Sequence, residues 1–307
     1  MARAGCRGVR ARGPQRLSDA SDHAVGVVID DPVVTHPRTF APLTVDERAT
    51  SSTWRELAAV LFGVRAYAPQ LSGRVVRWST DNQAAASILD VGSRQPHLQT
   101  LAVLIHQVAT LHGFTLSPIW VPREWNTDAD AMSRCVDIND WGLTPAAIDR
   151  ATLRWGPFVI DLFADPSNAK APAFFAARPA PGAKGVDALV CPWPLGLCYA
   201  CPPWPLLGRV FRRLLAVPAD AVVVVPLWPS QPWWPILCPD GVHTRREVLD
   251  LLLVDRSSFE LGITGRPDFL TTPSWRFTAL LLRWCPAAPV HKPAFCLARW
   301  RLLPCTC

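Results

Sequence analysis

Apolar and polar positions follow two different periods along the first 135 residues of the chain. Four short runs rich in apolar and β-branched residues predict strands: residues 25–29, 38–43, 74–81 and 114–122. Four other segments place apolar side chains at helical spacing and predict helices: residues 51–71, 82–92, 96–113 and 126–134. Strands that are interspersed with helices in this way predict an α/β fold, in which helices cover the faces of a sheet.

The segment that precedes these elements is less regular. Residues 8–16, GVRARGPQR, combine a proline with three arginines, and such a composition is poor for a central strand. Asp19 follows this segment closely, so we expect it to be held in place only if residues 15–21 form a strand themselves. The predicted first domain, residues 1–135, therefore has its weakest signal at its first strand.

Composition changes sharply near Arg134 and predicts a second domain. Of the 31 prolines, 8 precede this residue and 23 follow it, and of the 14 tryptophans, 4 precede it and 10 follow it. Residues 136–157 predict a linker with one helix, which Thr144 caps. Residues 158–290 follow the order strand, loop, strand, helix, strand, which predicts a second α/β domain, and residues 291–307 form a tail.

Charge and apolar content limit the classes of partner. The net charge is +6, from 31 basic and 25 acidic residues, and this mostly arginine-based positive charge suits a phosphate-backbone partner such as nucleic acid. The abundance of Ala, Pro, Arg and Gly also fits a GC-rich coding sequence, so charge leaves both explanations open. No apolar run is long enough to cross a bilayer, and we expect no membrane partner.

The cysteines offer one alternative site. Ten cysteines without a secretory signal predict reduced thiols rather than a disulfide framework. A structural zinc site remains an alternative, although the spacing lacks a second close pair of ligands; its residues would be Cys191, Cys198, Cys201 and Cys238.

Four carboxylates stand near the ends of the predicted elements: Asp19, Glu56, Asp81 and Asp130. If those ends converge, the four acids repel one another, which a protein tolerates only when a divalent cation neutralises them. Hard oxygen ligands suit Mg²⁺ or Mn²⁺, and two such ions can activate a water and stabilise the leaving oxygen of a phosphodiester. The simpler alternative is that Asp81 or Asn82 only caps the helix behind it.

Four fragments in this order carry a family resemblance: SDAS, WRELAAV, STDNQAAASIL and WVPREWNTDADAMSR. Together they resemble the ribonuclease H domain of retroelement polyproteins, most closely that of DIRS-type, tyrosine-recombinase retrotransposons. The last fragment matches the pattern Val-Pro-x-x-x-Asn-x-x-Ala-Asp-x-x-Ser-Arg through Val121, Pro122, Asn126, Ala129, Asp130, Ser133 and Arg134. The resemblance covers roughly the first 135 residues and implies a mixed sheet with flanking helices.

This resemblance also implies a function and a set of residues. The catalytic, metal-binding acids fall on Asp19, Glu56, Asp81 and Asp130, and contacts to nucleic acid fall on Asn82, Asn126 and Arg134. The implied reaction is hydrolysis of the RNA strand of an RNA–DNA hybrid during reverse transcription, with Mg²⁺ or Mn²⁺, beside the polymerase portion of a polyprotein. A catalytically inactive nucleic-acid-binding relic is the alternative, and a DNA adenine methyltransferase is another.

The second region carries its own resemblance, through VIDLFADPSNAKAPAFF, GVDALVCPW, YACPPWPLLGRVFRRLL and AVVVVPLWPSQPWW. These segments resemble the adenine-methyltransferase-like part that follows ribonuclease H in the same elements. The implied cofactor and base pocket comprises Asp161, Asn168, Cys201, Pro202, Pro203 and Trp204. Cysteine stands where active enzymes place Asp, Asn or Ser, and it is a poor hydrogen-bond acceptor. We therefore expect a degenerate domain that does not use S-adenosylmethionine.

Overall fold

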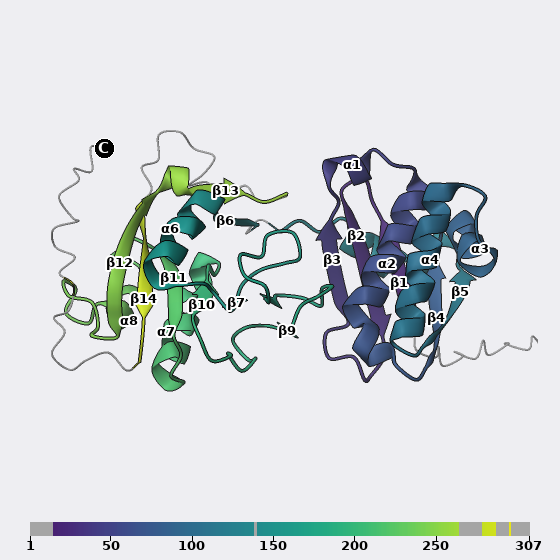
Figure 1. Cartoon of the computed structure of the whole chain (residues 1–307). Coiled ribbons are helices and arrows are strands. Elements are labelled where there is room, and N and C mark those ends of the chain that lie inside the picture. The colour runs from purple at the N-terminus through teal and green to yellow at the C-terminus, as the bar shows by residue number, and fades with distance from the viewer. Residues whose placement is uncertain (1–14, 138–139, 264–277, 287–294, 296–307) are drawn as a thin grey trace, which may run out of the picture. The chain divides into compact units, whose positions relative to one another are not determined.

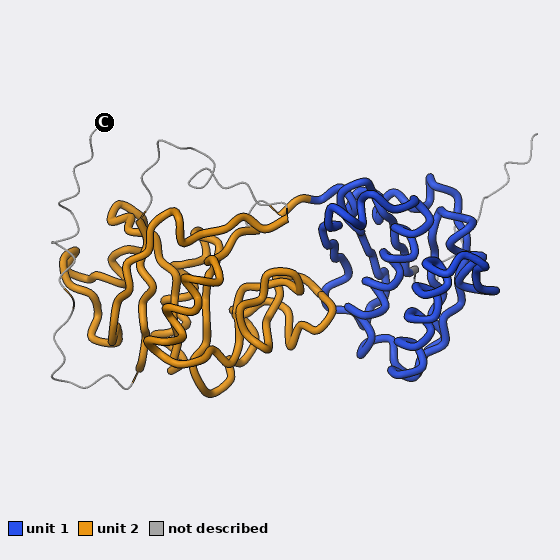
Figure 2. Tube along the Cα trace, turned by 45° about the horizontal axis from the view of Figure 1, so that its top comes forward, with its two compact units in different colours: residues 1–135 blue, residues 136–307 orange. Residues whose placement is uncertain are grey.

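The computed structural model describes residues 15–137, 140–263, 278–286 and 295. The chain divides into two compact units, with the boundary between Cys135 and Val136 (Figure 2). Within the described part of the chain, none of the helices combines the length and the hydropathy that crossing a bilayer requires. The tail expected at residues 291–307 lies outside the described residues except for position 295.

The first unit is built on a five-stranded mixed sheet with the order β3-β2-β1-β4-β5 (Figure 1). β1 pairs antiparallel with β2 and β2 with β3, whereas β1 pairs parallel with β4 and β4 with β5. The strands are β1 (Gln15–Ala20), β2 (Ala24–Asp30), β3 (Arg38–Pro42), β4 (Val75–Thr80) and β5 (Thr115–Trp120). The predicted mixed sheet with flanking helices is confirmed.

The poor first strand expected from composition is not what the structure shows, because β1 is the central strand of this sheet. Only residues 15 and 16 of the arginine-rich segment enter it, and the rest of β1 is the segment LSDA. Arg16 is buried in the strand, but its guanidinium lies 2.7 Å from the buried carboxylate of Asp31, which neutralises its charge. This ion pair and the pairing of β1 with β2 and β4 join residues that are distant in the sequence, and local composition does not reveal them.

The helices cover both faces of the sheet. They are α1 (Val45–Arg48), α2 (Ser52–Leu71), α3 (Gln83–Val91), α4 (Pro96–Leu111), the 3₁₀ turn η1 (Arg123–Trp125) and α5 (Thr127–Ser133). α2 packs beside α4 and supplies the main core against one face, where Val27 and Ile29 of β2 are fully buried. Leu17 and Val28 point to the other face and pack with Ala129 of α5. The alternation along β2 therefore separates α5 from α2 by the thickness of the sheet.

α5 approaches β2 unusually closely, and Gly26 makes this possible. A Cβ atom at position 26 would lie 2.3 Å from the backbone nitrogen of Ser133 and 2.6 Å from the carbonyl oxygen of Ala129. Only a residue without a side chain fits between this strand and this helix. The close contact sets the position of the α5 residues that face β1.

The second unit has its own five-stranded sheet with the order β12-β14-β11-β10-β7. β7, β10 and β11 are parallel, and β14 lies antiparallel between β11 and β12. These strands are β7 (Ile160–Asp161), β10 (Cys198–Ala200), β11 (Ala221–Pro226), β12 (Val248–Asp255) and β14 (Thr278–Trp284). Two small ladders join β6 (Trp141–Leu143) to β13 (Phe259–Leu261) and β8 (Phe175–Ala176) to β9 (Gly185–Val186).

Two helices cover opposite faces of this second sheet. α7 (Leu207–Ala216) packs on the face that includes Val223, and α6 (Pro145–Trp155) packs on the face that includes Val222 and Val224. The smaller elements are η2 (Trp204–Leu206), α8 (Trp234–Leu237) and η3 (Arg256–Ser258). The helix expected within the linker 136–157 thus contributes to the core of the second unit.

Candidate active site

Three of the four predicted acids meet at one end of the first sheet. Asp19 is the fifth residue of β1, Asp81 directly follows β4, and Glu56 lies near the start of α2. One carboxylate oxygen from each lies within 4.8 Å of the other two. β1 and β4 are adjacent and parallel, so residues at their carboxyl ends lie at the same end of the sheet. The topology therefore accounts for the convergence of Asp19 and Asp81.

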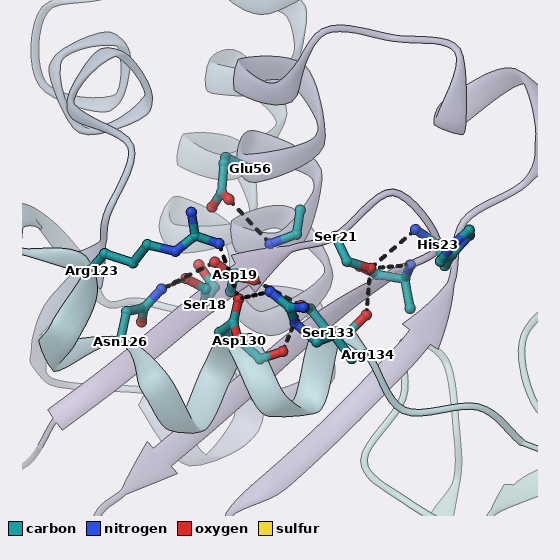
Figure 3. Close-up of polar contacts among 12 residues, drawn as sticks. Ser18, Asp19, Ser21, His23, Glu56, Arg123, Asn126, Asp130, Ser133 and Arg134 are labelled. Atoms are coloured by element: carbon teal, nitrogen blue, oxygen red, sulfur yellow. Dashed lines mark hydrogen bonds and ion pairs between the residues drawn. The ribbon is translucent and has the colours of Figure 1, made fainter.

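Hydrogen bonds from neighbouring elements fix two of these carboxylates. Glu56 accepts one from the backbone N–H of Ala20 at 3.1 Å and one from the hydroxyl of Thr80 at 3.2 Å. Asp19 accepts one from the hydroxyl of Ser133 at 2.8 Å, and the amide of Asn126 lies 3.4 Å from its other oxygen (Figure 3). Both acids are 5 % exposed. They are held in fixed orientations by donors from β1, from β4, and from α5 with the residue that caps it.

The environment of the three acids disfavours their charged forms. Burial, with smaller contributions from the charges of Asp19 and Asp81, raises the pKa of Glu56 to about 8. Burial likewise raises the pKa of Asp19 and of Asp81. Carboxylates that are both buried and mutually repelling are the donor set that a hard divalent cation would stabilise. The residues present therefore fit Mg²⁺ or Mn²⁺.

Asp130, the fourth predicted acid, stands at the rim of this cluster. Its side chain is 27 % exposed, and one of its oxygens lies 2.7 Å from the guanidinium of Arg134 and 3.4 Å from that of Arg123. The hydrogen bond from Arg134 lowers the pKa of Asp130, while the charge of Asp130 contributes to the raised pKa of Asp19. Asp130 is thus close enough to act on the cluster but belongs to a more solvated environment.

The three residues assigned to nucleic-acid contact have different surroundings. The side chain of Asn82 caps α3 by accepting a hydrogen bond from Ala85 N at 2.9 Å. Asn126 is fully buried, and its amide donates to the carbonyl oxygen of Ser18 at 3.0 Å. Asn126 thus joins the start of α5 to β1, and its expected contact with nucleic acid stays a prediction. Arg134 is exposed and pairs with Asp130.

Sequence reasoning gave no role to several residues that support the site. Ser133 belongs to the motif fragment, which gives it no role, and Thr80 is noticeable in the sequence only as the residue before Asp81. Trp120, at the end of β5, donates its indole N–H to the carbonyl oxygen of Asp81 at 3.0 Å. Arg123 lies seven residues before Asp130, in the turn that leads to α5. The position of Arg123 directly before the acid-bearing helix was the available signal.

In the second unit, Asp161 and Cys201 lie at the carboxyl ends of neighbouring parallel strands, because Tyr199 of β10 pairs with Asp161 of β7. The Asp161 carboxylate accepts hydrogen bonds from the N–H groups of Phe163 and Lys170, each at 3.1 Å. Burial raises the pKa of Asp161 to about 6. Both oxygens of the Asp161 carboxylate therefore hydrogen-bond to the backbone of the loop that follows β7.

The other residues of the expected cofactor pocket are also engaged within the unit. Asn168 accepts a hydrogen bond from Asp165 N at 2.8 Å and donates one to Asp140 at 3.2 Å. Burial raises the pKa of the Cys201 thiol, which keeps it neutral. Trp204 packs on the ring of Trp141 with a centroid separation of 4.2 Å.

Two prolines complete the expected cofactor pocket, and the four cysteines of the zinc alternative lie in the same unit. Pro202 is buried and Pro203 is half-buried. Among the described residues, the grouping suited to a metal ion is that of Asp19, Glu56 and Asp81, and the four cysteines of the zinc alternative form none. Within the described part of the chain, Cys191, Cys198 and Cys201 are free thiols.

Comparisons with known proteins give likeness in structure alone. No family model matches the chain, and no curated protein matches it. Ribonuclease H1 from the halophilic archaeon Halobacterium salinarum NRC-1 is 22 % identical, with a TM-score of 0.33, over 39 % of this chain and 92 % of that chain. LC11-RNase H1 in complex with an RNA/DNA hybrid is 18 % identical, with a TM-score of 0.32, over 39 % of this chain and 93 % of that chain.

A third similar structure is the N-terminal ribonuclease H domain of a Mycobacterium tuberculosis protein, fused to maltose-binding protein. It is 17 % identical, with a TM-score of 0.32, over 39 % of this chain and 87 % of that chain. The assignment of the site in this chain rests on its own strand order and side-chain geometry.

Proposed function

We propose that the first unit is a metal-dependent ribonuclease H that hydrolyses the RNA strand of an RNA–DNA hybrid. The observation that carries this proposal is that carboxylate oxygens of Asp19, Glu56 and Asp81 lie within 4.8 Å of one another. They do so at one end of a mixed sheet with the order β3-β2-β1-β4-β5. Asp130 would complete the ligand set from α5, because its charge already acts on the same cluster. The proposed metal ions are Mg²⁺ or Mn²⁺.

The protein's contribution to this chemistry is a rigid array of oxygen ligands. A pair of bound divalent ions would supply an activated water and stabilise the leaving oxygen of the phosphodiester. Glu56 would keep its orientation because Ala20 N–H and the Thr80 hydroxyl hold one oxygen each. Asp19 would keep its orientation through Ser133 and Asn126. Selectivity for the hybrid would come from its shape and the RNA 2′-hydroxyl groups rather than from base sequence.

The proposed biological setting is a DIRS-type retrotransposon polyprotein, in which a polymerase portion would be the partner during reverse transcription. The resemblance of the four motif fragments supports this setting. The competing proposal is a relic that binds nucleic acid without cutting it.

A cleavage assay separates the two proposals. The full chain is incubated with Mg²⁺ and an RNA–DNA hybrid labelled on the RNA strand, beside RNA–RNA and DNA–DNA duplexes of the same sequence. We expect cleavage of the RNA in the hybrid alone, leaving 3′-hydroxyl and 5′-phosphate ends, and its loss when EDTA is added. Binding of the hybrid without any cleavage would support the relic and overturn the nuclease.

For residues 158–290 we propose a methyltransferase-like scaffold that does not transfer methyl groups. The adjacent parallel strand ends of Asp161 and Cys201 support the scaffold, and the commitment of Asp161 to backbone N–H groups argues against a free cofactor pocket. Calorimetry with S-adenosylmethionine is the test, on the natural chain and on Cys201→Asp. Cofactor binding by the natural chain, together with methylation of adenine in DNA, would overturn this proposal.

A further inference from the structure

Two arginines reach the same oxygen of Asp130 from different elements (Figure 3). Arg134 lies one turn further along the chain, at the end of α5, and its contact of 2.7 Å has the length of a strong charge-assisted hydrogen bond. Arg123 reaches across from η1, and its contact of 3.4 Å is at the outer limit of a hydrogen bond. Arg134 therefore provides the strong hydrogen bond to Asp130, and the interaction between Arg123 and Asp130 is weak.

Arg123 stands in the field of the whole acid cluster. Burial acts to raise the pKa of Asp19, Asp81 and Asp130, and the positive charge of Arg123 acts in the opposite direction on each. Its side chain is nevertheless 74 % exposed, so its donors face solvent beside the buried acids. An exposed guanidinium next to a buried anionic cluster is placed to meet whatever approaches that cluster.

The chemistry of the proposed substrate matches this position. A phosphodiester that approaches four carboxylates brings further negative charge to a site that already repels it. A guanidinium presents a planar fork of donors that matches the oxygens of a phosphate. The backbone under Arg123 is a short 3₁₀ turn behind Pro122, which fixes where the side chain starts.

We propose that Arg123 binds a non-bridging phosphate oxygen of the RNA strand beside the acid cluster, exchanging its weak contact with Asp130 for the substrate. This inference rests on the proposed ribonuclease function and adds to it a substrate-binding residue that is not one of the four acids. Of the two arginines, Arg134 keeps its ion pair with Asp130 when the substrate binds.

The first test is the salt dependence of hybrid binding, measured in EDTA so that no cleavage occurs. Each phosphate contact that a cation makes adds about one to the slope of log K against log salt concentration. We expect Arg123→Ala to reduce that slope by about one, and Arg123→Lys to keep it because the charge remains. Arg65→Ala is the control: Arg65 is exposed on α2, nine residues and about 13 Å along the helix from Glu56, and its slope should equal that of wild type.

The second test is cleavage in Mg²⁺. We expect Arg123→Ala to lower kcat by about 10²-fold, as when one electrostatic donor is removed from an active site. The kcat of Arg123→Lys should lie between the values of wild type and Arg123→Ala. The melting temperature and the Mg²⁺ concentration for half activity should stay at the wild-type values. If half activity requires more Mg²⁺ while the salt slope is unchanged, Arg123 acts only through Asp130 and the inference is wrong.

The two proposals fail in different ways. If the wild-type chain binds the hybrid and never cleaves it, the proposed ribonuclease activity is wrong. The salt dependence of binding then still tests the proposed contact between Arg123 and phosphate. An Arg123→Ala variant with the wild-type slope defeats the contact, even when wild type cleaves. A chain that does not bind the hybrid at all defeats both.

Discussion

The hydroxyl of Ser133 donates a 2.8 Å hydrogen bond to the carboxylate of Asp19, a residue 114 positions earlier in the chain. The same hydroxyl lies 2.9 Å from the carbonyl oxygen of Asp130, so it ties the last turn of α5 to the central strand. Ser133 is fully buried and lies beside Gly26 on β2. The orientation of one proposed metal ligand therefore depends on the last helix of the first unit.

Replacing Ser133 by Ala should weaken metal binding. The change leaves a buried Asp19 oxygen without its best donor, at a cost of about 1–3 kcal/mol to stability. Loss of such a support also lowers metal affinity by about 10–100-fold in known metal sites, so the Mg²⁺ concentration for half activity should rise. Ser87→Ala, at an exposed position of α3, is the control and should leave both quantities unchanged. A Ser133→Ala chain with the wild-type Mg²⁺ requirement would contradict a role for this contact.

Asp81→Asn should abolish hybrid cleavage and spare hybrid binding. The amide keeps the shape of the carboxylate but removes one negative charge, so a metal is held less well and a phosphate is repelled less. Asp128→Asn is the matched control, because Asp128 is exposed and only forms a surface ion pair with Arg38 at 3.6 Å. Gel analysis of cleavage and fluorescence anisotropy for binding check both variants. Equal cleavage by the Asp81 variant and wild type would show that the acids are assigned wrongly.

Gly26→Ala should separate α5 from β2. The new methyl group would overlap backbone atoms of α5, which cannot move aside as a flexible side chain can. We expect a loss of about 1–3 kcal/mol in the free energy of unfolding, together with loss of cleavage, since α5 carries Asp130 and Ser133. Gly142→Ala is the comparison, because a Cβ there would meet the nearest atom, in Lys170, at an ordinary 3.6 Å. Urea denaturation of both variants provides the measurement, and equal losses would contradict the close packing at Gly26.

Asp161 should make the second unit less stable as pH rises from about 4 to about 6. Burial raises its pKa to about 6, so the folded state binds this proton more tightly than the unfolded chain does. Its contribution to stability is complete below the unfolded pKa of about 4 and is lost as pH passes the folded pKa. Relative to Asp161→Asn, which does not titrate, wild type should lose up to about 3 kcal/mol over this interval. Unfolding curves at successive pH values check this, and parallel pH profiles would contradict it.

Much of the first unit could be predicted because its signals are local. The ranges 51–71, 74–81 and 114–122 lie within one or two residues of α2, β4 and β5, since periodicity and caps mark these elements directly. The convergence of Asp19, Glu56 and Asp81 follows once the order of strands is known.

Other features of the first unit depend on contacts between residues that are distant in the sequence. The buried Arg16 of β1 is paired with Asp31, and neither residue alone predicts the pair. Asn126 stands in the motif fragment at a position from which we expected a contact with nucleic acid, and the packing of α5 against β1 buries it completely. Motif spacing identifies which residues gather at a site, whereas the direction of each side chain is settled by burial.

The position of α5 along the chain has a consequence during translation. The apolar face of Leu17 and Val28 is covered by Ala129, which the ribosome delivers after all five strands of the sheet. A nascent chain that stops before α5 presents that face uncovered, at the stage when partly made domains are most prone to associate wrongly. The acid cluster gains its hydrogen bond from Ser133 in the same step, so the proposed site is complete only when the last residues of the first unit have been synthesised.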